Sequence, residues 1–131
     1  MISVRLVKLF FLIVFVVIVT GCKQSTRLSG YYVLLMQGEK PFENGKMIKL
    51  YSGDRFMLAQ YKEDGSVVMS GGGKFTLDEE GYTEVMDYFS EAPAQRGKPV
   101  TYRYTLTGNK FIIEAEMHGF TLKETWQKTD D

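Results

Sequence analysis

Two acidic residues stand on otherwise apolar faces of predicted strands. Glu84 lies between Tyr82 and Met86 in the alternation of one strand, and Glu124 lies two residues before Trp126 in another. A carboxylate buried without a partner is costly, so both acids must be paired, hydrogen-bonded or protonated inside the fold. We therefore expect any interior chemistry of this chain to centre on Glu84 and Glu124.

The sequence offers partners for these acids. Tyr82, Tyr102 and Tyr104 fall on predicted inward faces and can supply hydroxyl groups, and Arg55 supplies charge if its face of the third strand points inward. The acids then form either a structural network that fixes strand register or a polar patch that orients a small amphipathic ligand. The candidate ligand-binding residues are Tyr32, Arg55, Met57, Tyr82, Glu84, Tyr102, Tyr104, Glu124 and Trp126.

A pair of carboxylates also serves glycoside hydrolysis. The strand pattern described next predicts a small closed barrel, which offers a sugar chain no open cleft. We therefore expect no enzyme.

Turn signals divide the chain after Leu28 into short runs rich in aromatic and β-branched residues. They are Asn44-Gly45, Gly53-Asp54, Asp64-Gly65, Glu80-Gly81, Gly108-Asn109 and His118-Gly119, with a longer break over 90–97. Seven breaks predict eight strands, at 29–36, 46–52, 55–62, 66–77, 82–89, 99–107, 110–117 and 120–128.

The predicted fold is all-β, an eight-stranded antiparallel up-and-down β-barrel, with a two-sheet sandwich as the alternative. Alternation predicts the inward side chains of most strands. They are Ile48 and Leu50; Phe75 and Leu77; Tyr82, Glu84, Met86 and Tyr88; Val100, Tyr102, Tyr104 and Leu106; Phe111, Ile113 and Ala115; and Phe120, Leu122, Glu124 and Trp126. The third strand does not reveal its inward face.

Three features remain open at this level. Gly71-Gly72-Gly73 marks either a bulge where the sheet bends or room for a ligand. The methionines scattered over the strands fill gaps in the core or line an adaptable pocket. Phe42, in the loop over 37–45, is either a lid residue or part of a plain surface loop.

The N-terminal segment has the three parts of a secretory signal. Arg5 and Lys8 precede eleven unbroken apolar residues over 9–19, which is short for a membrane span of about 20 residues. The segment then ends in Val19-Thr20-Gly21-Cys22, which resembles the lipobox of bacterial lipoproteins.

The lipobox resemblance implies cleavage before Cys22 and its modification with acyl chains such as palmitate. Several acyl chains together anchor a protein stably in a membrane. The resemblance implies a cell-envelope protein facing the periplasm or the surface, and Lys23 favours the outer membrane. The expected organisation is a signal peptide over 1–21, a lipidated cysteine and tether over 22–27, and a barrel domain over 28–131.

Composition excludes several classes of protein. Without Arg5 and Lys8 the chain has 14 basic residues against 16 acidic ones, so it shows no electrostatic footprint for nucleic acid. A single cysteine forms no internal disulfide, and His118, the only histidine, leaves no zinc ligand set. We expect no metal or other cofactor, and we expect His118 to be exposed and inert.

Several short motifs follow one another along the chain: Gly30-Tyr31-Tyr32, Asp54-Arg55-Phe56-Met57, Lys74-Phe75-Thr76-Leu77-Asp78, Gly81-Tyr82-Thr83-Glu84 and Glu124-Thr125-Trp126. Their order resembles that of a lipocalin-like family of small envelope lipoproteins. The resemblance implies a calycin-type barrel with a central cavity and no catalytic machinery. Tyr32 would then plug the barrel floor.

Two functions follow as hypotheses. The first is a membrane-anchored protein, monomeric, that binds a small apolar or amphipathic ligand in its barrel. The second is an interaction or inhibitor module with a filled barrel that meets a protein partner through its loops, since eight strands enclose little more than their own side chains.

Overall fold

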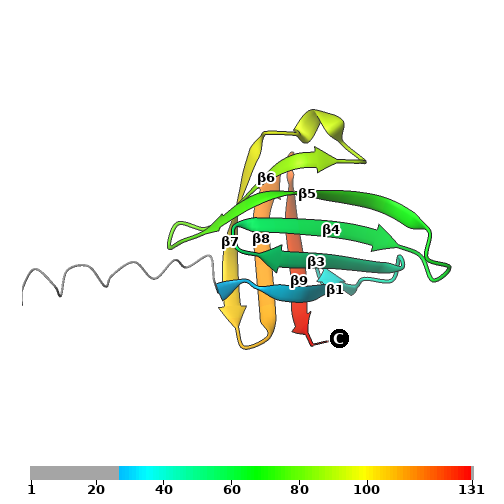
Figure 1. Cartoon of the computed structure of the whole chain (residues 1–131). Coiled ribbons are helices and arrows are strands. Elements are labelled where there is room, and N and C mark those ends of the chain that lie inside the picture. The colour runs from blue at the N-terminus through cyan, green and yellow to red at the C-terminus, as the bar shows by residue number, and fades with distance from the viewer. Residues whose placement is uncertain (1–26, 131) are drawn as a thin grey trace, which may run out of the picture.

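The computed structural model describes residues 27–130, which form a closed antiparallel up-and-down barrel of eight long strands (Figure 1). The strands are β1 (Gly30–Gln37), β3 (Lys46–Ser52), β4 (Arg55–Tyr61), β5 (Val67–Leu77), β6 (Tyr82–Phe89), β7 (Pro99–Thr107), β8 (Lys110–Met117) and β9 (Phe120–Thr129). The fold class and the eight strands are confirmed. The predicted signal peptide, Cys22 and the tether up to residue 26 lie outside the described residues.

Two short elements complete the chain. β2 (Lys40–Pro41) turns back onto the end of β1, and the 3-10 helix η2 (Pro93–Gln95) lies in the connection between β6 and β7. Phe42 follows β2 and is partly buried against the core, so this loop is packed down at that residue.

Pairing of the first and last strands closes the barrel. β1 pairs with β3 on one side and with β9 on the other, where Leu34 lies opposite Trp126. β3, β4 and β5 run crosswise to β7, β8 and β9 (Figure 1), yet all belong to a single continuous sheet, which rules out the sandwich. The strand pairings and the hydrophobic core described here lie within 28–129, so this part of the chain contains a closed barrel with its own core, as a domain that folds by itself requires.

One end of the barrel is filled by aromatic side chains. Tyr51 lies at their centre, with ring centroids 5.0 Å from Phe75, 5.3 Å from Tyr32 and 6.4 Å from Phe111 in edge-to-face arrangements. Edge-to-face contacts add specific attraction to the burial of apolar area. We call this cluster the aromatic floor; its members are Tyr32, Tyr51, Phe56, Phe75, Tyr82 and Phe111, each at most 3% exposed.

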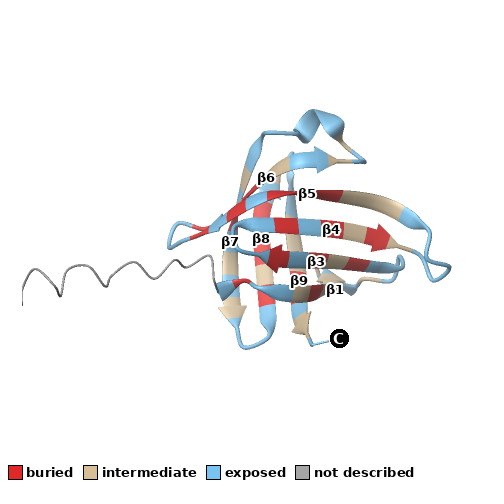
Figure 2. Ribbon diagram, viewed as in Figure 1, coloured by how far each residue is buried: buried red, intermediate tan, exposed pale blue. Residues whose placement is uncertain are grey.

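The prediction of Ile48 and Leu50 as the inward pair of β3 is wrong. The buried set is Met47, Lys49 and Tyr51, while Leu50 is 45% exposed. Both faces of this strand carry apolar residues, and the charge of Lys49 made its face look external. The alternating burial along β3, β4 and β5 is visible in Figure 2. On β4 the inward face proves to be Phe56, Leu58 and Gln60.

A bulge explains the failure of alternation at the end of β6. The register between β5 and β6 shifts at Gly72/Gly73, so Tyr88 is 44% exposed although it was predicted inward. A Cβ added at Gly73 would lie 1.9 Å from the carbonyl oxygen of Val85. The missing side chain therefore allows the backbone of β6 to approach and does not create room for a ligand.

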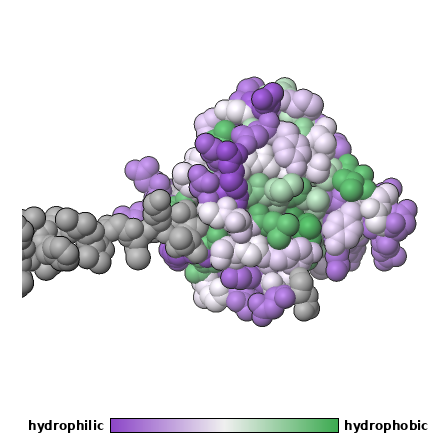
Figure 3. Space-filling view, in the orientation of Figure 1, coloured by the Kyte–Doolittle hydropathy of each residue, from purple (hydrophilic) through white to green (hydrophobic). Residues whose placement is uncertain are grey.

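Phe120, Leu50 and Met57 lie outside the core. Phe120, predicted inward, is 55% exposed because it begins β9 at the hairpin turn, beyond the buried part of the strand. Leu50 and Met57 are paired across β3 and β4, and a hydrophobic patch lies over these strands on the outer surface (Figure 3).

Candidate ligand-binding cavity

A cavity of about 570 Å³ occupies the half of the barrel beyond the aromatic floor. This volume lies within the range of pockets that hold small organic ligands. Every long strand contributes to its wall, and the lining side chains change from polar near the aromatic floor to apolar farther from it.

A polar layer lies directly on the aromatic floor. Since inward residues alternate with outward ones, each strand advances one inward position every two residues. Lys49 is one inward step beyond Tyr51 on β3, and Glu84 is one step beyond Tyr82 on β6. Glu124 is one step beyond the floor-level Trp126, which lies opposite Phe111. We call Lys49, Glu84, Tyr102 and Glu124 the polar layer; all four line the cavity.

Lys49 and Glu84 form a buried ion pair. Their exposed fractions are 3% and 5%, and the Lys49 ammonium donates to Oε1 of Glu84. The Tyr82 hydroxyl donates to the same oxygen at 2.7 Å and lies 2.8 Å from the Tyr51 hydroxyl. Nζ of Lys49 also lies 4.9 Å from the centre of the Trp126 ring, within the range of a cation–π contact.

The ion pair fixes the charge of the lysine. Burial disfavours the charged form of Lys49, but the attraction of the neighbouring acidic groups, Glu84 first among them, together outweighs this effect and holds the pKa of Lys49 above its ordinary value. Burial also raises the pKa of the Tyr82 and Tyr102 hydroxyls. Lys49 is therefore a cation, both tyrosines keep their protons, and Tyr82 donates its proton to Glu84 in a hydrogen bond.

Glu124 has only part of its hydrogen-bonding capacity used. Nε1 of Trp126 donates to Oε2 of Glu124 at 2.8 Å. Glu124 lines the cavity, and among residues 27–130 no group donates a hydrogen bond to its other oxygen. Burial raises the pKa of the Glu124 carboxyl, Lys49 opposes this rise and Glu84 adds to it.

The outer part of the cavity is apolar and rich in methionine. Met47, Met69, Met86 and Met117 all line it, so these four are pocket residues, whereas Met57 is exposed on the outer surface. Flexible thioether side chains adapt their shape to a ligand. Leu58, Phe89, Val100 and Leu122 complete this wall, and Gln37, Gln95, Lys98 and His118 form an exposed rim.

The structure brings together four of the nine sequence-predicted ligand-binding residues in the cavity wall: Glu84, Tyr102, Glu124 and Trp126. Tyr82 lies immediately below them and is hydrogen-bonded to Glu84. Tyr32 belongs to the floor, as the resemblance implied for the plug position, and Tyr104 packs against Phe111 instead of lining the cavity.

Arg55 and Met57 do not reach the interior. They lie on the outer face of β4, where Arg55 donates to Asp87 at 2.5 Å and Met57 is 56% exposed. The condition under which Arg55 and Met57 were candidates is not met, because Phe56, Leu58 and Gln60 occupy the core side of the strand. Lys49 was missed; the sequence signal for it was its place between Met47 and Tyr51 in the alternation.

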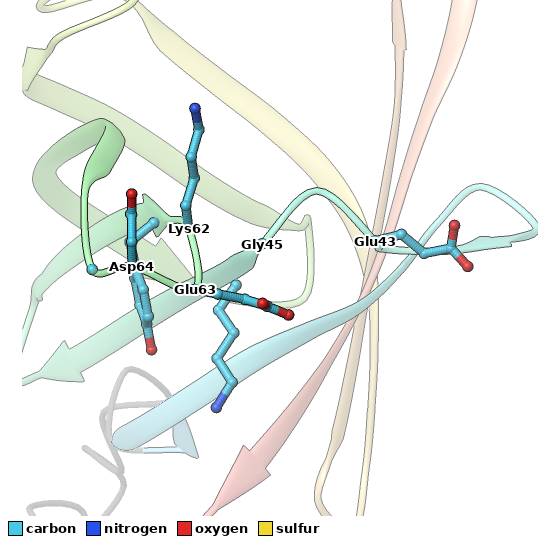
Figure 4. Close-up of a pocket in the computed structure, with 8 residues that line it drawn as sticks. Glu43, Gly45, Lys62, Glu63 and Asp64 are labelled. Atoms are coloured by element: carbon cyan, nitrogen blue, oxygen red, sulfur yellow. The ribbon is translucent and has the colours of Figure 1, made fainter.

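A second hollow lies on the surface between the β2–β3 loop and the β4–β5 turn (Figure 4). It measures about 890 Å³ and is lined largely by charged residues of both signs, including Glu43, Lys62 and Glu63. In Figure 4 these three side chains point in different directions and do not converge on one position. The interior cavity is therefore the candidate site, although it is smaller.

Comparisons with known proteins assign no family to this chain. Comparison with protein-family models and with curated proteins gives no significant match. Within residues 27–130, no helix is both long and apolar enough to cross a membrane. The same residues contain no group of three or more histidine, cysteine, aspartate or glutamate side chains placed to hold a metal ion.

Proposed function

We propose that this protein is a membrane-anchored, lipocalin-like lipoprotein that binds a small hydrophobic or amphipathic molecule inside its barrel. The observation that carries the proposal is the cavity of about 570 Å³, which is apolar and methionine-rich toward its mouth and has the largely buried polar layer at its inner end. Ligand pockets combine these features: an apolar lining supplies affinity, and a few polar groups fix orientation.

Binding requires no chemical step. The apolar part of the ligand removes methionine and leucine side chains from water, which contributes about 25 cal/mol per Å² of apolar surface buried. The polar part meets groups already held in place, because Lys49 and Tyr82 both donate to Glu84. A preorganised site pays less ordering entropy when it binds.

The cavity can be tested with the chain from residue 23 to 131. An environment-sensitive apolar dye should bind saturably and quench or shift the fluorescence of Trp126, the only tryptophan. Val100→Phe fills the cavity and should weaken binding, whereas Val67→Phe, on the exposed start of β5, should leave it unchanged. A well-folded barrel with no saturable binding would refute the proposal.

The anchor is a separate part of the proposal, supported by the sequence Val19-Thr20-Gly21-Cys22. The full chain, expressed in a bacterium fed with labelled palmitate, should carry the label and sediment with membranes, with the outer membrane favoured by Lys23. Cys22→Ser should abolish labelling and retain the precursor length. Equal labelling of both proteins would exclude lipidation at Cys22.

The filled-barrel alternative required a solid interior. The aromatic floor fills one half, but the cavity occupies the other. We therefore favour interior binding over the interaction module.

A further inference from the structure

The charges inside the cavity do not balance. The polar layer contains one cation, Lys49, and two carboxylates, Glu84 and Glu124. Lys49 pairs with Glu84 alone, because no ion pair joins it to Glu124. The cavity therefore presents one carboxyl group whose charge is not matched by a bonded cation.

One carboxylate oxygen of Glu124 is an unused hydrogen-bond acceptor in this layer. Trp126 holds one carboxylate oxygen at 2.8 Å and so fixes the orientation of the group. Glu124 lines the cavity, and its other oxygen accepts no hydrogen bond from residues 27–130. A ligand that donates a hydrogen bond there, and best a cationic donor, would complete the network.

The lysine at the rim does not offset this preference. Lys98 is exposed at the mouth, where water and salt weaken its attraction for an anion. Glu124 lies deeper, next to Trp126 and the buried ion pair, where the effective dielectric constant is lower and a charge has a stronger effect. An anionic head group at the polar layer would meet two carboxylates and a lysine that is already paired.

We infer that the cavity takes an amphiphile with an ammonium head group, which enters first and donates to Glu124 while its apolar chain lies along the methionine-rich wall. This inference rests on the proposed function of interior binding. The head-first orientation follows from the order of the layers, because the polar groups lie on the aromatic floor and the apolar wall lies toward the mouth. No covalent step is involved.

The test compares decylamine, decanol and decanoate, which share an apolar chain and differ in their head groups. Each is titrated into residues 23–131 at about pH 7, where the amine is charged, with Trp126 fluorescence and calorimetry as readouts. We expect decylamine to bind about tenfold or more tightly than either of the others, as a charge-assisted hydrogen bond implies. The tryptophan signal should respond most to decylamine, because its head group approaches Glu124.

Glu124→Gln provides the matched variant. It retains the side-chain shape and an oxygen that can accept from Trp126, but it removes the charge. We expect it to reduce decylamine affinity about tenfold while changing decanol affinity less than about threefold. Glu63→Gln, in the exposed turn after β4, makes the same chemical change outside the cavity and should leave all three affinities unchanged.

The outcomes separate this inference from the proposal on which it rests. Tighter binding of decanoate, or equal binding of all three probes, overturns the ammonium assignment but leaves interior binding intact. If none of the three probes binds although the dye does, the ammonium assignment is also overturned. Failure of the probes and the dye together overturns the proposed function itself. The ranking by the wild-type chain decides the assignment even if Glu124→Gln does not fold.

Discussion

The buried pair of Lys49 and Glu84 gives the sharpest prediction about stability. Lys49→Met replaces the cation with an apolar side chain of similar length. It leaves Glu84 at 5% exposure with Tyr82 as its one remaining donor. Removing one partner of a buried ion pair costs about 3–5 kcal/mol, because the other charge stays buried without compensation.

The two ends of the pair are not equivalent. After Glu84→Gln, Lys49 keeps its contact with the Trp126 ring and the electrostatic attraction of Glu124. After Lys49→Met, the polar layer has no second cation that could pair with Glu84. We therefore expect Lys49→Met to cost at least about 1 kcal/mol more than Glu84→Gln. The double variant should recover most of the loss, since an apolar and neutral pair is often as stable as the buried ions.

Urea unfolding of residues 23–131, followed by Trp126 fluorescence and by circular dichroism, measures these differences. A domain of this size has a total stability of about 5–15 kcal/mol, so the single variant should shift the midpoint far but can remain folded. A loss of 3 kcal/mol corresponds to a fall in Tm of more than about 10 °C. If the two single variants and the double variant have additive effects, the pair is not coupled and the description of the polar layer is wrong.

Three further variants test other parts of the structure. Glu124→Gln should leave stability at neutral pH unchanged or raise it. The pKa of Glu124 is raised in the folded chain, so the wild type loses stability as pH rises through the pKa of the folded state, and the variant does not. Urea midpoints at several pH values measure the difference in stability between variant and wild type, and a difference that shrinks with rising pH would contradict this reasoning. Gly73→Ala should cost about 2 kcal/mol or more because its Cβ would overlap the backbone of Val85, whereas Thr76→Ala on the exposed face of β5 should cost much less; equal unfolding midpoints for the two would argue against the close approach. Arg55→Ala should change the free energy of unfolding by less than about 1 kcal/mol, because Arg55 and Asp87 are both more than half exposed; a larger loss would mean that the outer pair has a structural role.

The strands could be predicted closely because glycine turns and alternation are local signals. Every predicted strand agrees with an observed one within one residue at each end. The errors occurred where a non-local contact overrides the local pattern. Lys49 faces inward because Glu84, 35 residues away, neutralises it, and Tyr88 faces outward because a bulge shifts the register between β5 and β6.

The candidate site was predictable only in part for the same reason. Glu84 and Glu124 were recognisable as misplaced charges on apolar faces. Their distinct roles were not, because only the fold shows that Glu84 has a cation and Glu124 does not. The methionine-rich wall also required the fold, since methionine serves equally well as core or lining.

The position of Trp126 and Glu124 on the last strand has a consequence for synthesis. The seam between β1 and β9 joins residues such as Leu34 and Trp126, which are almost as far apart in sequence as the domain allows. Contacts of such long range form late and slow the folding of β proteins. A chain emerging from its N-terminus therefore has neither a closed wall nor a complete polar layer until its final strand is made. The ability to bind a ligand would then appear in one step, when the barrel closes. A chain truncated before β9 would neither close its barrel nor bind a ligand.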